Sequence, residues 1–116
     1  MQVYRQSVTE YAQDRDLVAG QVMLRRNWNH YGYVEDILVD ARFRRRGIGR
    51  MLLSQGIEWA RSKHLPGMIP ETQDNNVPAC RFYESLGFQL GGFDRLLFKG
   101  VNPGTQEIAL YWYLVF

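Results

Sequence analysis

The sequence predicts an α/β protein in which two helices pack on a mixed β-sheet. Segments with the two-residue period of strands alternate with segments of helical period, in the order strand, strand, strand, helix, strand, helix, strand, strand. The 116 residues suffice for one core, and 46% of them are hydrophobic while 22% are charged, as in globular domains. We therefore expect a single domain that covers residues 1–116.

The first half of the chain is expected to hold three strands and a helix. The strands are residues 8–12, 17–24 and 33–40, and the helix is residues 51–63. Asp14-Arg15-Asp16 predicts the turn of an antiparallel hairpin between the first two strands. In the third strand, simple alternation would place Glu35 and Asp36 on opposite faces of the sheet.

The second half is expected to hold a short strand, a helix and two further strands. The strands are residues 68–73, 88–98 and 107–116, and the helix follows Asn76 and stops at Gly87. Asn76 is a good N-cap, and Pro78 suits the first helical turn. Apolar residues recur at helical spacing from Ala79 to Leu86.

Composition and charge exclude several classes of protein. The formal net charge of +2 gives no global attraction to nucleic acid. Cys80 is the only cysteine, which fits a reducing cytoplasm, and no apolar run is long enough to span a membrane. His30 and His64 have no partner at metal-ligand spacing, so we expect no metal. A cytoplasmic protein is the expectation.

A basic, glycine-bearing turn between the third strand and the first helix predicts an anion site. It reads Arg44-Arg45-Arg46-Gly47-Ile48-Gly49-Arg50. The first amides of a helix lack intrahelical partners, and glycine lets a phosphate approach the backbone. A plain solvated basic turn is the alternative. The pattern lacks the lysine of a P-loop and the third glycine of a dinucleotide-binding turn.

Three sequence blocks together resemble the GNAT family of N-acetyltransferases. They are Arg44-x-x-Gly47-x-Gly49 after a strand, Asn76-x-x-Ala79-x-x-Phe82-Tyr83-Glu84-x-Leu86-Gly87-Phe88 after the next strand, and the aromatic strand 108–113. Finer details are most similar to streptothricin acetyltransferases. They are Asn27-Trp28-Asn29, Tyr33-x-Glu35-Asp36-Ile37, residues 71–76, Gly91-Gly92-Phe93-Asp94 and Tyr111-Trp112-Tyr113.

The resemblance implies a truncated version of the family fold. Its members usually carry a first strand and two helices before the segment that corresponds to the opening hairpin, and those helices form one wall of the acceptor pocket. The chain has no room for them, so sheet edge and apolar surface would be uncovered. We therefore expect a homodimer in which the partner covers part of that surface.

The resemblance also implies acetyl-CoA as the cofactor. Backbone amides from Arg45 to Arg50 would wrap its pyrophosphate, arginine side chains would reach the other phosphate, and the strand edge Ile37–Val39 would pair with the pantetheine arm. Asn76, beside its capping role, would contact the same arm. The implied cofactor residues are Ile37, Leu38, Val39, Arg44, Arg45, Arg46, Gly47, Ile48, Gly49, Arg50, Asn76, Ala79 and Tyr83.

Acetyl transfer to an amine needs a base for the ammonium group and an acid for the departing sulfur. Tyr83 matches the family tyrosine that protonates the sulfur, although an ordinary packing role is the alternative. Glu35, Asp36 and Glu71 are candidates for the base, and we favour Glu35.

Acidic and aromatic groups suit a small cationic amine as the acceptor, for example a streptothricin-type antibiotic. The candidate acceptor residues are Trp28, Asp36, Glu71, Asp94, Tyr111 and Tyr113, although core packing would also explain the aromatic ones. Two rivals remain: a non-catalytic CoA-binding protein that has lost its acceptor wall, and a nucleic-acid-binding module. The latter lacks aromatic residues interleaved with the basic ones.

Overall fold

The computed structural model describes residues 7–14 and 17–116. Their helices and strands follow the predicted order, with two short 3₁₀ helices added. The chain forms two compact units, one that ends at Met68 and one that runs from Ile69 to Phe116.

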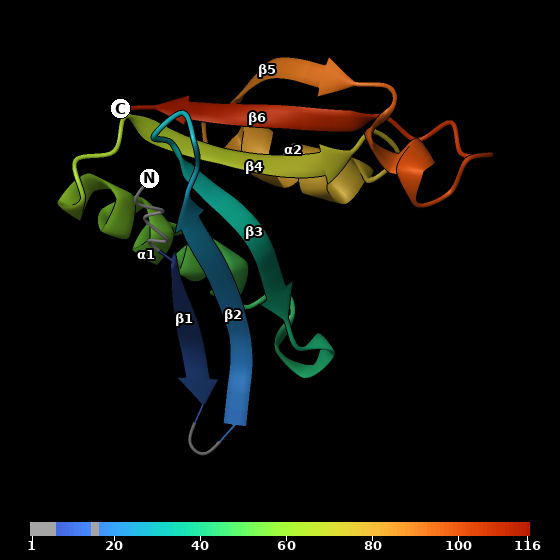
Figure 1. Ribbon diagram of the computed structural model, residues 1–116. Coiled ribbons are helices and arrows are strands. Elements are labelled where there is room, and N and C mark those ends of the chain that lie inside the picture. The colour runs from blue at the N-terminus through green and yellow to red at the C-terminus, as the bar shows by residue number, and fades with distance from the viewer. Residues whose placement is uncertain (1–6, 15–16) are drawn as a thin grey trace. The chain divides into compact units, whose positions relative to one another are not determined.

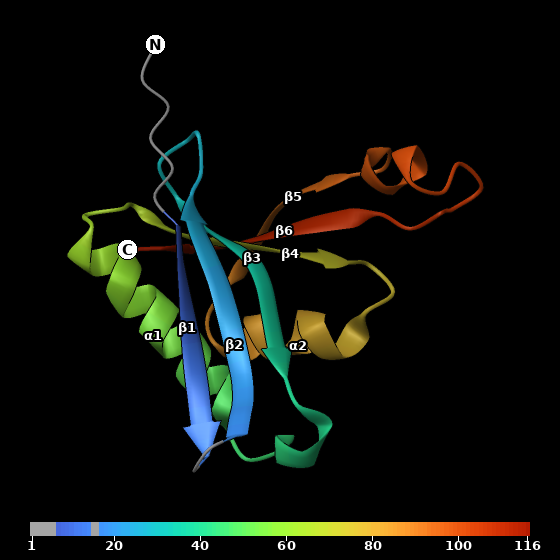
Figure 2. The same ribbon diagram turned by 60° about the horizontal axis from the view of Figure 1, so that its bottom comes forward.

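The first unit is a three-stranded antiparallel sheet with a helix on one face. Its strands are β1 (Ser7–Asp14), β2 (Leu17–Arg26) and β3 (Gly32–Val39), and its helix is α1 (Ile48–Ser62). β2 lies between β1 and β3, so the predicted hairpin is confirmed, whereas residues 15 and 16 of its turn lie outside the described part. Figure 2 shows α1 running along the sheet beside all three strands.

The core of this unit lies between α1 and the sheet. Its fully buried side chains include Val22 and Leu24 of β2 and Leu52 and Leu53 of α1. Burial of each such leucine contributes about 1.5–3 kcal/mol to stability. Val22, Leu24 and their neighbours on the helix side alternate along β2 with half-exposed residues, which is the pattern expected of a sheet covered on one face.

β3 contains a β-bulge at Glu35, which corrects one prediction. Met23 pairs with Asp36 and Leu24 pairs with Val34, so Glu35 has no residue opposite it. Asp36 therefore shares the face of Met23, away from α1, and Glu35 turns to that same face because it neighbours Val34. The expectation that Glu35 and Asp36 lie on opposite faces was wrong, because the bulge adds one residue to the alternation.

The second unit holds three strands and a helix. Its strands are β4 (Gly67–Gln73), β5 (Gln89–Asp94) and β6 (Ala109–Val115), in the spatial order β4, β6, β5, and its helix is α2 (Val77–Ser85). Figure 1 shows α2 alongside β4. The Thr72 Oγ1 of β4 lies 3.5 Å from the Cys80 Sγ of α2, which fixes the contact between these two elements.

β5 is shorter than the strand predicted over residues 88–98. After β5 the chain forms a 3₁₀ helix, η2 (Leu97–Gly100). The Asp94 carboxylate accepts hydrogen bonds from the amides of Leu96 (2.8 Å) and Leu97 (3.1 Å), and this local capping turns the chain away from the strand direction. The apolar residues Leu96 to Phe98 had made the segment resemble a continuous strand.

A buried hydrogen bond holds the centre of the second unit. The Trp112 indole Nε1 of β6 donates to the Thr72 Oγ1 of β4 at 3.0 Å, and only 6% of each residue is exposed. Burying a polar group without a partner costs free energy, and this pair satisfies both groups at once. The bond therefore fixes how β6 sits beside β4.

Candidate functional site

The basic turn has the backbone geometry of an anion site. Gly47 is the N-cap of α1, with φ 76°, and no side chain caps the helix start. The first amides of α1 are therefore left for an external acceptor. A Cβ placed at Gly47 would meet no atom within 4 Å, so the space beside the turn is open. The predicted strand–turn–helix arrangement is confirmed.

The basic side chains of the turn are largely uncommitted. Arg44, Arg45, Arg46 and Arg50 are exposed, and within residues 7–14 and 17–116 none of them forms an ion pair. The Arg46 guanidinium lies over the ring of the buried Phe43, 5.3 Å from its centroid, which leaves its N–H groups free to turn outward. The turn therefore presents several forked donors suited to phosphate oxygens.

Arg42, by contrast, is neutralised by Asp40 at the end of β3. Its Nε lies 3.1 Å from the Asp40 Oδ1, and its backbone N–H also donates to that oxygen. These hydrogen bonds, the side-chain one first, lower the pKa of Asp40 from 3.8 to about 2. Asp40 thus caps the 3₁₀ helix η1 (Ala41–Phe43), which leads from β3 into the basic turn.

A cavity of about 330 Å³ opens at the end of β3 beside the basic turn. Two of the predicted cofactor residues, Leu38 and Val39, line it, and Leu38 is 52% exposed. Its other lining residues are Val18, Ala19, Gly20, Gln21 and Asp40. Ile37 lies on the opposite face, because its register partner Val22 points toward α1.

Glu35 is held by an ion pair that the sequence analysis missed. The Arg25 Nε lies 2.7 Å from the Glu35 Oε1, and 38% of each side chain is exposed. Arg25 pairs directly with Tyr33, so Glu35 is its diagonal neighbour, and that relation can be found only once the register is known. Asp36 lies on the same face and forms no ion pair within the described ranges.

Trp28 stands at the tip of the loop between β2 and β3. It is 86% exposed, so core packing does not explain this residue. The loop is braced under it, because the Asn27 amide N donates to the Tyr31 carbonyl O at 2.8 Å and the Asn27 Nδ2 to the Asn29 Oδ1 at 3.1 Å. The indole is presented to solvent by a fixed turn.

In the second unit, α2 carries the predicted Asn76, Ala79 and Tyr83. The Asn76 side chain accepts a hydrogen bond from the Ala79 amide at 3.2 Å, so its capping role is confirmed. Tyr83 is 4% exposed, and its ring packs edge-on against Phe82 and Phe88, with centroids 5.2 and 5.4 Å away. The ring is thus a core residue of its unit, which explains its place without requiring a catalytic role.

Four of the predicted acceptor residues come together in the second unit. Burial raises the pKa of Tyr111 above its usual value, and the charges of Glu71 and Asp94 and the Tyr113 side chain raise it further. A Cβ at Gly91 would lie 2.2 Å from the Tyr113 Cδ1, so this ring lies directly over a glycine at the bulge of β5. Two carboxylates and two phenols create a negative environment that favours a cation.

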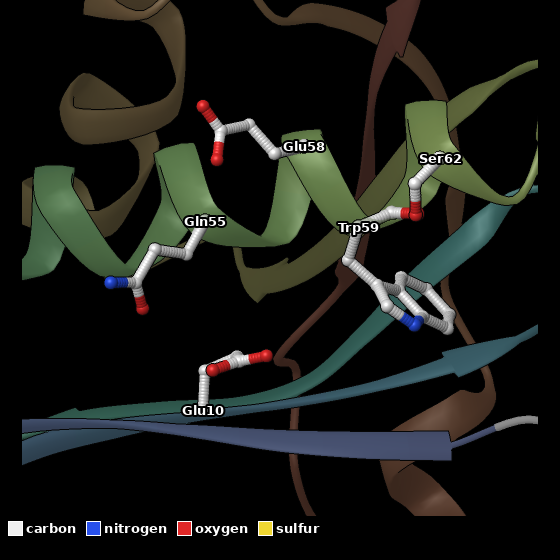
Figure 3. Close-up of a pocket in the computed structure, with 5 residues that line it drawn as sticks. All are labelled: Glu10, Gln55, Glu58, Trp59 and Ser62. Carbon is white, nitrogen blue, oxygen red and sulfur yellow. The ribbon is translucent and has the colours of Figure 1, made fainter.

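A second cavity, of about 440 Å³, lies between β1 and α1 and contains no predicted site residue. Its lining residues are Glu10, Gln55, Glu58, Trp59 and Ser62. Figure 3 shows Gln55 and Trp59 pointing from α1 toward β1, whereas Glu58 points away from the strand. This cavity opens on the helix side of the sheet, so it lies on the opposite face of the sheet from Glu35 and Asp36.

No group of three or more His, Cys, Asp or Glu side chains in the described ranges is arranged to hold a metal ion. Neither described helix combines the length and apolar character that a bilayer span requires.

Comparison with known proteins gives consistent matches. A model of the acetyltransferase (GNAT) family matches residues 4–88. Streptothricin acetyltransferase A of Bacillus subtilis (strain 168) is 42% identical over 97 residues, which cover 84% of this chain and 56% of that protein. Streptothricin acetyltransferase of Escherichia coli is 40% identical over 100 residues, which cover 86% of this chain and 57% of that protein. The chain thus spans a little over half the length of these relatives.

Solved structures match as well. A Bacillus anthracis (strain Ames) protein, described as a streptothricin acetyltransferase and crystallised with acetyl coenzyme A, superposes with a TM-score of 0.91 at 45% identity. The match covers 95% of this chain and 62% of that one. A nourseothricin acetyltransferase superposes with a TM-score of 0.85 at 33% identity, covering 94% of this chain and 65% of that one. The predicted α/β fold class is confirmed by these matches.

Proposed function

Because the chain belongs to the acetyltransferase (GNAT) family, we propose that it transfers the acetyl group of acetyl-CoA to a primary amine of a small cationic acceptor. A streptothricin-type antibiotic is the proposed acceptor class, from the names of its similar relatives. The observation that carries the proposal is the open basic turn at Gly47, where uncapped helix amides lie beside arginines that form no ion pair with any described residue.

In this proposal the turn binds the cofactor phosphates. The amides between Arg45 and Arg50 donate to the pyrophosphate, and the exposed arginine side chains add charge-assisted hydrogen bonds. Gly47 and Gly49 keep the backbone free of side chains where the oxygens approach. Ile37, Leu38 and Val39 of β3, and Asn76 and Ala79 of α2, complete the proposed contacts.

Acid and base roles go to Tyr83 and Glu35. The bound cofactor supplies a thioester, whose carbonyl carbon is attacked by the amine nitrogen. A new C–N bond forms while the C–S bond breaks. Glu35 takes the proton that the amine loses, and Tyr83 gives a proton to the departing sulfur. Water then carries the proton from the Glu35 carboxyl group to the Tyr83 phenolate, which restores both side chains. The products are the acetylated amine, an amide, and the free thiol of CoA. Asp36 and Glu71 are the alternative bases.

Charge complementarity supports a cationic acceptor. Glu71 and Asp94 lie near the phenols of Tyr111 and Tyr113 in the second unit, and their combined charge attracts an ammonium group. In the first unit, the exposed Trp28 offers a π-face for a cation. Asp36 is the remaining residue that we assign to acceptor binding.

The same proposal includes one acetyltransferase domain over residues 1–116, in the cytoplasm, assembled as a homodimer. Tyr11 of β1 supports the dimer, since it is 52% exposed and pairs with Gln21 of β2 on the face of the sheet away from α1. Light scattering on dilute protein should give the mass of a dimer, and a stable monomer at micromolar concentration would refute this part.

The test of the reaction is release of free thiol from acetyl-CoA in the presence of a streptothricin-type antibiotic, with acetylated product identified by mass spectrometry. Gly47→Glu should stop the reaction, because it places bulk and negative charge beside the phosphate oxygens. Cofactor binding without any thiol release would reject catalysis and leave a non-catalytic CoA-binding protein as the function.

A further inference from the structure

The β-bulge turns Glu35 to the face away from α1 but leaves it without a cross-strand partner. Glu35 has no residue opposite it on β2, because Met23 pairs with Asp36 and Leu24 with Val34. The extra residue of a bulge is unpaired, so no cross-strand neighbour restrains its side chain on that face. A general base, however, must lie within hydrogen-bond reach of the proton that it removes. Another contact has to hold Glu35 in place.

Arg25 supplies that contact and is itself restrained on three sides. Its Nε lies 2.7 Å from the Glu35 Oε1. Its Nη1 donates to the Asn27 Oδ1 at 2.8 Å, and its guanidinium carbon lies 4.4 Å from the centroid of the Tyr33 ring. A planar guanidinium can serve these partners at once with different N–H groups and one face. Arg25 therefore joins the bulge to the loop that carries Trp28.

We propose that Arg25 is the positioning residue of Glu35, fixing this carboxylate for the acid–base step. The inference rests on the proposed function, in which Glu35 is the base. Arg25 occupies one carboxylate oxygen, Oε1, and within the described ranges no residue is bonded to the other, Oε2. Oε2 is thus the oxygen that takes the proton of the amine, directly or through a water. Arg25 itself neither gives nor takes a proton in the reaction.

The role is one of orientation, not of stability. Both side chains are 38% exposed, and ion pairs at such sites contribute little to the free energy of folding. Replacing Arg25 should therefore leave the fold intact. The neighbouring Arg26 offers a matched control, because it lies on the same strand and its Nη2 contacts the His30 Nδ1 at 2.6 Å, with no contact to Glu35.

The first arm of the test needs no turnover. In ¹⁵N NMR spectra of the full chain, the Nε–H of Arg25 should exchange slowly with water, because it is committed to Glu35. Glu35→Gln should speed this exchange at least tenfold and leave that of Arg26 unchanged. An Arg25 signal that is equally protected in both proteins would overturn the proposal.

The second arm measures kcat and KM with acetyl-CoA and a streptothricin-type antibiotic. Arg25→Gln should lower kcat roughly tenfold to a hundredfold, as misplacement of a catalytic group does, with the KM for acetyl-CoA within about twofold of wild type. Arg25→Lys should recover part of the loss, since one ammonium group can reach Glu35 but not Asn27 as well. Arg26→Gln should keep the wild-type rate.

A double variant separates positioning from a merely structural role. In a Glu35→Gln background, Arg25→Gln should cause no further loss of kcat, because the carboxylate that it orients is gone. An equal fractional loss in both backgrounds would overturn the proposal. If the wild-type protein transfers no acetyl group at all, the proposed function fails, while the NMR arm still decides whether Arg25 fixes Glu35.

Discussion

Substitutions at Gly47 should separate the conformational role of this glycine from its role beside the phosphates. Its φ of 76° is left-handed, a region that costs a residue with a Cβ about 1–2 kcal/mol. An added Cβ meets no atom within 4 Å, so no clash adds to that cost. Gly47→Ala should therefore lower the melting temperature by roughly 4–12 °C in the absence of ligand.

The ligand-dependent part follows from mass action. Acetyl-CoA at a hundred times its dissociation constant stabilises the folded protein by about 2.7 kcal/mol, and at ten times by about 1.4 kcal/mol. A tenfold loss of affinity in Gly47→Ala would thus remove roughly half of the thermal shift. Gly47→Glu should remove all of it, because the carboxylate would repel the phosphates. Differential scanning fluorimetry with and without acetyl-CoA measures both quantities.

Gly100 provides the control. A Cβ there also meets no atom within 4 Å, but the backbone of Gly100 is not left-handed. Gly100→Ala and Gly100→Glu should therefore keep both the stability and the thermal shift of the wild type. A wild-type shift in Gly47→Glu would refute the phosphate site, and a wild-type melting temperature in Gly47→Ala would refute the left-handed backbone.

Three further predictions concern other parts of the chain. Tyr83→Phe keeps the buried ring and removes only the acidic hydroxyl, so it should lower kcat by a hundredfold or more while acetyl-CoA affinity, measured by calorimetry, stays nearly the same. A wild-type rate would leave Tyr83 a packing residue. Thr72→Val leaves the Trp112 indole without a partner and should cost about 1–3 kcal/mol in urea unfolding, whereas an unchanged midpoint would refute the bond. The pKa of Asp40 is lowered from 3.8 to about 2 in the folded protein, so the ionised carboxylate stabilises the fold above pH 4. This contribution is lost as the pH falls toward 2 and the carboxylate takes up a proton. Asp40→Asn should therefore unfold less steeply over that range in circular dichroism, and parallel curves would contradict the shift.

The order of helices and strands could be predicted because it depends on local periodicity. Two details of the site were predictable for the same reason. The glycine-bearing turn predicted an open helix start, as found at Gly47, and a helix start before Pro78 calls for a cap, as at Asn76. These features involve residues close in sequence, so the sequence carries the signal directly.

Contacts that depend on strand register were not predictable. Alternation assumes that each residue faces one partner, and the bulge at Glu35 breaks this assumption without any local signal. The ion pair with Arg25 follows from the shifted register, so it was missed as well. The end of β5 was misplaced because the apolar residues after Asp94 resemble a strand, whereas their amides donate hydrogen bonds to the Asp94 carboxylate and turn the chain.

The hydrogen bond between Trp112 and Thr72 gives the second unit its own optical probe. Trp112 is only 6% exposed, so its fluorescence should be emitted at shorter wavelength than that of Trp28, which is 86% exposed and open to collisional quenchers. Trp59 lies in the first unit, on α1. Trp28→Phe/Trp59→Phe and Trp28→Phe/Trp112→Phe chains would each report on one unit. Coincident emission changes in urea would mean that the two units melt as one cooperative body.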